Sequence, residues 1–163
     1  MVSRTRWFYT LVPVLFLLSA CTTAGANPPP SATGTPSSSG GSIGLAVSKT
    51  CAEMSDPQCV SVNGEDIVRP SAFDKAGVDS ATVDHSTKQD VVDVTFDKDG
   101  AAILHTLTKQ AMQDGSTARL IVEIGGNLKA AVTVLHTLDG PELELLLAPD
   151  DNAKHVVQQI SAG

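Results

Sequence analysis

A short apolar segment at the N-terminus limits how much of this 163-residue chain can take part in a fold. Residues 7–18 are almost entirely apolar, and two positive charges, Arg4 and Arg6, precede them. A stretch of about a dozen residues is too short for a transmembrane helix, which needs about 20. Its length and its basic flank are typical of a secretory signal peptide. We therefore predict that residues 1–20 are removed and that the chain folds outside the cytoplasm.

The end of this segment carries a cleavage pattern. Leu18-Ser19-Ala20-Cys21 resembles the bacterial lipobox, in which small residues precede a cysteine that becomes acylated. The resemblance implies cleavage before Cys21, attachment of lipid to its sulfur, and a position on the extracytoplasmic face of the bacterial cell membrane. An ordinary signal peptide that is followed by a cysteine by chance is the alternative. Because the apolar run does not continue beyond Cys21, we expect lipid rather than a helix to hold the mature protein.

The segment after the cleavage pattern has the composition of a linker. Residues 22–43 consist mainly of Pro, Ser, Thr, Gly and Ala, and they include no charged residue. Such a stretch cannot bury enough apolar surface to offset the entropy lost on ordering. We predict a disordered tether over residues 21–43, which includes the lipidated cysteine, and one folded domain over residues 44–163. A domain of about 120 residues is long enough for a single hydrophobic core.

The mature chain is acidic and poor in aromatic residues. All 18 Asp and Glu residues follow residue 20, whereas two of the 11 Lys and Arg residues precede it. An acidic surface disfavours binding to nucleic acid. Phe73 and Phe96 are the only aromatic residues after residue 20, so that stacking surfaces for sugars or single-stranded nucleic acid are also disfavoured. The core must therefore be aliphatic, and we expect no nucleic-acid partner.

Two cysteines remain once Cys21 is assigned to lipid. Cys51 and Cys59 form an even pair in an exported domain, which predicts a disulfide. A metal site is the alternative, but it would need further ligands, and the first histidine after the pair is His85. We therefore expect a short loop closed by a disulfide, which would stabilise a small domain by about 2–3 kcal/mol.

Hydrophobic periodicity in the predicted domain indicates several strands and two helices. Val92, Val94 and Phe96 alternate with polar residues, which is typical of a half-buried strand. Leu104 and Leu107 have helical spacing within a longer apolar stripe. We predict strands over residues 78–83, 91–96, 119–124, 128–135 and 143–147, and helices over residues 101–113 and 149–160. This order predicts an α+β fold, with a mostly antiparallel sheet and two helices on one face.

No motif in the domain indicates catalysis. No nucleophile elbow is present, and no free cysteine remains. The acidic pairs Asp90/Asp93 and Asp97/Asp99 lack the spacing of a calcium loop, and helix capping explains the second pair. We therefore expect no enzymatic activity, no metal and no cofactor. Four histidines lie outside any zinc-binding pattern: His85, His105, His136 and His155.

Five motifs follow one another in the predicted domain: Val94-Thr95-Phe96, Asp99-Gly100-Ala101, Leu107-Thr108, residues 119–126 and residues 150–160. Their order resembles that in the head subdomain of SecD, which belongs to the SecDF protein-translocation motor. Val132 stands where that family has proline, and residues 145–147 are leucines where it has Ile-Ser-Gly. The membrane helices and base subdomain of SecD have no counterpart in this chain. The resemblance implies a SecDF-head-like fold over about residues 64–160 and the binding of a polypeptide, but no motor activity.

These observations favour a lipid-anchored, non-catalytic binding module for an envelope or exported protein, with a role in protein export as one form of that function. A lipid-tethered inhibitor or exclusion factor against an incoming cationic enzyme or agent is the alternative, and an acidic surface would suit it. A carrier for an apolar ligand is a further alternative, which requires an internal cavity.

Overall fold

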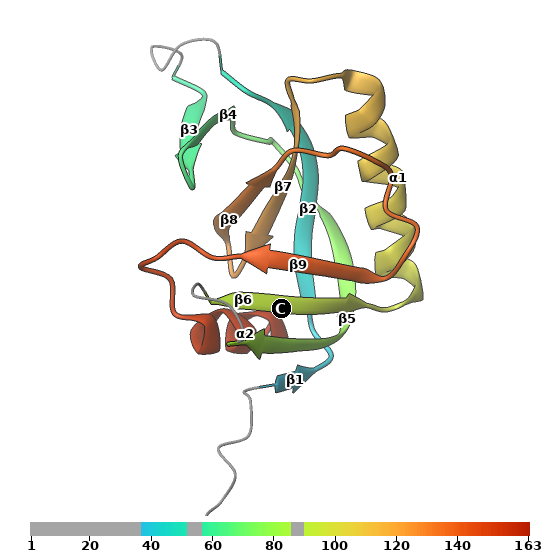
Figure 1. Ribbon diagram of the computed structural model, residues 1–163, viewed down its shortest axis with the longest axis vertical. Helices are drawn as coiled ribbons and strands as arrows, with labels where there is room; N and C mark the ends of the chain where they lie inside the picture. Colours follow the sequence, from blue (N-terminus) through green and yellow to red (C-terminus); the bar gives the residue numbers. More distant parts are fainter. Residues whose placement is uncertain (1–36, 52–56, 86–89) are drawn as a thin grey trace, which may run out of the picture. The chain divides into compact units, whose positions relative to one another are not determined.

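The computed structural model describes residues 37–51, 57–85 and 90–163, which belong to one compact unit (Figure 1). The predicted α+β class, the antiparallel sheet and the two helices are confirmed. Along the chain, the elements are β1 (Ser37–Ser39), β2 (Ser42–Lys49), β3 (Cys59–Val62), β4 (Glu65–Val68), β5 (Asp74–Asp84), β6 (Val91–Phe96), α1 (Lys98–Asp114), β7 (Ala118–Ile124), β8 (Asn127–Val132), β9 (Glu142–Leu146) and α2 (Ala153–Ser161).

One curled antiparallel sheet is built around the long strand β5 (Figure 1). The order across the sheet is β8-β7-β2-β5-β6-β9, and β1 continues the line of β2 along the same side of β5. Gly40 and Gly41 separate β1 from β2, with φ angles of 80° and 116°. A Cβ atom at Gly41 would lie 2.0 Å from the carbonyl oxygen of Ile160, so a larger residue would push α2 away from the sheet.

Both helices pack against the same face of the sheet. The inward residues of the strands and the apolar stripes of the helices form one buried cluster, which is aliphatic except for Phe96. The predicted aliphatic core is therefore confirmed. The cluster includes Ile43, Leu45, Val78, Val83, Val92, Val94, Phe96, Leu120, Val122, Ile124, Leu143 and Leu145 from the strands, Leu104 and Leu107 from α1, and Val156, Val157 and Ile160 from α2.

The β3–β4 hairpin forms a second, smaller cluster with the other face of the sheet. Its turn, Asn63-Gly64, has φ angles of 52° and 83°, as a two-residue type I′ turn requires. Val62 and Ile67 of the hairpin pack against Ile121 of β7, and all three side chains are buried. β7 is therefore buried on both faces, which explains its nearly continuous apolar sequence.

The folded domain begins earlier than predicted. We placed its start at residue 44, directly after a tether over residues 21–43. Residues 37–39 form β1, and Ser42 and Ile43 belong to β2, with Ile43 only 1% exposed. Backbone pairing with β5 holds these residues in strands, and a serine- and glycine-rich sequence gives little sign of such pairing. The rest of the predicted tether, Cys21 and the signal segment lie outside the described residues.

Other predicted elements are present with different ends. α1 begins at Lys98 instead of residue 101, and α2 begins at Ala153 instead of residue 149 because Asn152 is its N-cap. β8 ends at Val132, whereas the predicted strand continued to residue 135. The described segments contain no helix that is both long and apolar enough to cross a membrane.

The N-cap of α1 gives a first test of the fold. Oδ1 of Asp97 accepts a hydrogen bond from the N–H of Gly100 at 2.7 Å. Asp97→Ala removes this acceptor, and we expect a loss of about 1 kcal/mol in the free energy of unfolding. Denaturation followed by circular dichroism measures the change. Asp97→Asn keeps an acceptor and should stay close to the wild type; an equal loss in both variants would contradict the capping role.

Candidate functional site

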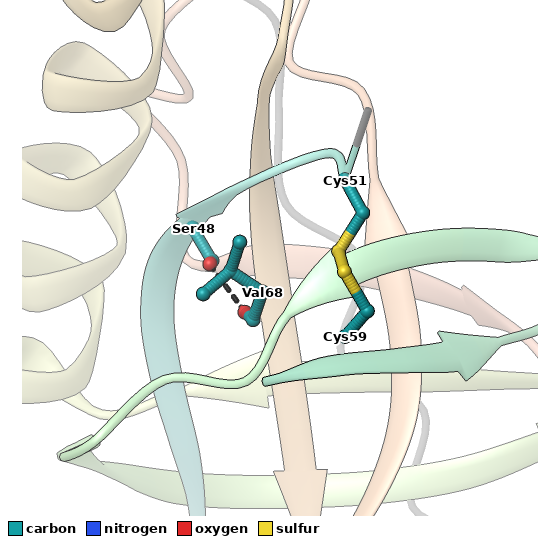
Figure 2. Close-up of a disulfide and its surroundings, with 4 residues drawn as sticks. All are labelled: Ser48, Cys51, Cys59 and Val68. Carbon is teal, nitrogen blue, oxygen red and sulfur yellow. Dashed lines mark hydrogen bonds between the residues drawn. A yellow bond between two sulfur atoms is a disulfide. The ribbon is translucent and has the colours of Figure 1, made fainter. Parts of the chain in front are cut away.

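The predicted disulfide is present and fastens the hairpin to β2 (Figure 2). Cys51, just after β2, is bonded to Cys59, the first residue of β3, with an S–S distance of 2.02 Å. Nearby, the Ser48 hydroxyl donates a hydrogen bond to the carbonyl oxygen of Val68. Because the two sulfurs are bonded to each other, the metal-site alternative for this cysteine pair is wrong.

The predicted polar residues do not converge on one site. Asp97 is used as a helix cap, and Nδ1 of His85 lies 3.3 Å from Oδ1 of Asp90. Nδ1 of His105 lies 3.2 Å from Oδ1 of Asp139, and both side chains are exposed. Within residues 37–51, 57–85 and 90–163, no three His, Cys, Asp or Glu side chains are grouped so that they could hold a metal ion.

The strands at the two ends of the sheet order, β8 and β9, each pair with one strand and differ in what else covers them. At β8, the Asn63 side chain of the hairpin donates a hydrogen bond to the carbonyl oxygen of Lys129 at 2.9 Å. The ammonium group of Lys129 also forms an ion pair with Asp151, and both side chains are largely buried. At the other edge, β9 pairs with β6 alone (Figure 1). Since an uncovered edge can pair with another strand, β9 is the candidate binding surface.

The backbone of β9 alternates between β6 and the open edge. The N–H of Phe96 donates a hydrogen bond to the carbonyl oxygen of Pro141 at 2.8 Å. The N–H of Leu147 donates to the carbonyl oxygen of Asp90 at 3.4 Å. Bonded pairs recur at every second residue of an antiparallel ladder. The odd-numbered residues of β9 therefore direct their N–H and C=O groups to β6, and the even-numbered residues direct theirs away from it.

The even-numbered residues of β9 thus form an open edge, which we define as Glu142, Glu144 and Leu146. Their backbone groups have no partner in the described part of the chain. All three side chains are exposed, and Leu146 is 55% exposed although it is apolar. This edge combines free backbone donors and acceptors with two carboxylates and one apolar side chain.

The neighbouring strand adds a third carboxylate. Asp93 on β6 lies directly opposite Glu144, at a position where the two side chains are close. A hollow of about 300 Å³ lies among Asp93, Glu142, Glu144 and Thr95. None of the three carboxylates forms a salt bridge with another described residue. Because like charges directly opposite each other are destabilising, a cationic group bound here would relieve the repulsion.

A second hollow is apolar and smaller. It has a volume of about 230 Å³ and lies between the last residues of β8, the loop after it, and β9. Leu135 on its wall is 80% exposed, while Leu143 and Leu120 are buried. Ligand pockets usually have volumes of about 300–1,000 Å³. The hollow has room for one apolar side chain of a partner rather than for a lipid chain, so it gives little support to a carrier function.

Sequence reasoning predicted a strand over residues 143–147 but missed that it is an edge. Pro141, directly before the strand, was a usable signal because proline in sheets is mostly confined to edges and strand starts. The alternation of Glu and Leu from residue 142 to 145 was a second signal. It places the two glutamates on one face, with the leucines on the other.

The repulsion between Asp93 and Glu144 can be measured. Glu144→Lys replaces a like-charge pair by an opposite-charge pair, and we expect a gain of about 0.2–1 kcal/mol in the free energy of unfolding. Denaturation at low salt measures the gain, which should shrink at high salt. In an Asp93→Asn background the gain should be smaller. A gain of the same size in that background would contradict the pairing.

Comparisons with known proteins gave no match: the chain matches no family model, no curated protein and no solved structure. The resemblance to the SecD head subdomain stays a prediction from the sequence motifs.

Proposed function

We propose that this protein is a lipid-anchored, non-catalytic module that binds a protein partner at the extracytoplasmic face of the cell membrane. The observation that carries the proposal is the open edge of β9, with three residues whose backbone groups have no partner in the described part of the chain. Strand addition at such an edge is a common mode of polypeptide recognition. The SecD-like motifs support an exported chain or a component of the export machinery as the partner.

The anchoring part of the proposal rests on the sequence. The signal segment, the lipobox-like residues and the linker composition support lipid at Cys21. The disulfide between Cys51 and Cys59 supports an oxidising compartment, because disulfides are rare in the cytosol. A domain attached in this way would meet partners near the membrane surface.

The carboxylates beside β9 favour a second candidate function. A lipid-tethered inhibitor of an incoming cationic enzyme would use the same acidic surface, formed by Asp93, Glu142 and Glu144. Complementary charge accelerates encounter and selects partners. The two functions differ in the partner, which is an envelope or exported protein in the first and a soluble cationic enzyme in the second.

Lipid attachment is tested by Cys21→Ser. This variant should lose acylation, and the chain that is cut from its signal segment should be released from the membrane fraction because it carries no lipid. Fractionation, together with mass spectrometry of the mature N-terminus, measures the change. The matched control is the double variant Cys51→Ser/Cys59→Ser, which should stay in the membrane fraction. A mature wild-type chain that begins at another residue, without lipid, would contradict the anchoring proposal.

The binding function is tested by photo-cross-linking in living cells. A photoreactive residue at Glu144 should form adducts with a protein partner, whereas the same residue at Gln110, exposed on α1, should form few. Mass spectrometry identifies the adducts. Envelope proteins or exported chains among them would support the first function, and a soluble cationic enzyme would support the second. Equal adducts at both positions, or none, would contradict a binding surface at β9.

A further inference from the structure

We propose that the partner presents an extended, cationic segment that adds to the sheet as a strand along β9. This inference rests on the proposed protein-binding function and specifies what that function recognises. The segment would carry Lys or Arg at alternate positions and an apolar residue at the end that meets Leu146.

The backbone geometry provides the first argument. The N–H and C=O groups of the open edge recur at every second residue, with the spacing that another strand requires. Among the described residues, β9 pairs with β6 and with no other strand, and Figure 1 shows these two strands side by side. A bound strand would therefore complete hydrogen bonds at Glu142, Glu144 and Leu146 without disturbing those between β9 and β6.

The side chains define the chemistry of the segment. Residues directly opposite each other in a sheet project from the same face, so the partner residues opposite Glu142 and Glu144 would lie beside these carboxylates. Asp93 adds a third negative charge next to Glu144. The partner residue opposite Leu146 would be apolar. An antiparallel segment would therefore read apolar-x-Lys-x-Lys, where x is any residue without a charge and Arg can replace Lys.

The inward face of β9 adds a weaker preference. Leu143 points into the core and also lines the apolar hollow of about 230 Å³. A partner residue opposite Leu143 would project from the same face of the sheet. We therefore expect a small apolar residue at that position of the segment, between the two cationic residues.

A second copy of this chain does not fit the same edge. If two β9 strands paired antiparallel about Glu144, this glutamate would lie opposite its own copy, with Asp93 of each chain alongside. Edge strands with like charges resist pairing with themselves in this way. The acidic side chains thus disfavour self-association while leaving the edge open to a cationic strand.

A peptide titration tests the proposal with the full mature protein in detergent. The probe is the fluorescent peptide acetyl-Val-Thr-Lys-Val-Lys-Thr-amide, and anisotropy gives its dissociation constant. We expect the double variant Glu142→Lys/Glu144→Lys to weaken binding at least tenfold. The matched control Asp114→Lys, which reverses one exposed charge at the end of α1, should change binding less than twofold.

Two methylated peptides separate strand addition from simple charge attraction. One carries N-methyl groups on the amides of its two lysines, and the other carries them on the residues that precede the lysines. In an added strand, only every second amide of the peptide faces β9. The methyl groups of one peptide would therefore block hydrogen bonds to β9 and those of the other would not, so the two affinities should differ at least tenfold. Equal affinities would overturn strand addition, because an electrostatic contact does not depend on which backbone edge is blocked.

A measurement on the wild type keeps the test independent of how the variants fold. Hydrogen exchange with and without the peptide should show new protection at the amides of Glu142, Glu144 and Leu146. Protection elsewhere, with none at these amides, would overturn the proposal. If the peptide does not bind but cross-links form at Glu144, the protein-binding function stands and strand addition is wrong; if neither is seen, both are wrong.

Discussion

The fold depends on the close approach of α1 to the central strand β5. The N–H of Asp97 donates to the carbonyl oxygen of Gly77 at 3.0 Å, and a Cβ atom at Gly100 would lie 2.3 Å from that oxygen. A Cβ atom at Gly77 would in turn lie 2.0 Å from the Asp97 carboxylate. Two glycines therefore let the first turn of α1 rest on β5. β5 also pairs with β1 and β2 on one side and with β6 on the other. The contact with β5 therefore positions the helix over the strands on both sides of it.

The sequence predicted those parts of the fold that depend on local patterns. Alternation from Val92 to Phe96 indicated β6, and two cysteines in an exported domain indicated the disulfide. The start of the domain was missed because β1 and the first residues of β2 are held by backbone bonds to a distant strand. The type I′ turn at Asn63-Gly64 was also missed, although this dipeptide is a strong hairpin signal.

The candidate site could be predicted only in part. Glu144 was visible as a charged residue in the predicted strand over residues 143–147, and Glu142 directly before it, but the strand order that makes β9 an edge depends on long-range pairing. The position of Asp93 opposite Glu144 depends on register, which one residue of slippage would change completely. The amino-acid composition indicated that the mature chain is acidic, but it could not show where on the surface the carboxylates gather.

The hairpin fastened by Cys51 and Cys59 has a consequence for assembly. It lies over the outer side of β7 and contacts the β8 backbone at the Lys129 carbonyl through Asn63, so that it stands beside one end of the sheet. A strand that approached β8 would meet this hairpin, whereas a strand that approached β9 would displace no hydrogen bond among the described residues, so growth of the sheet in both directions at once is disfavoured.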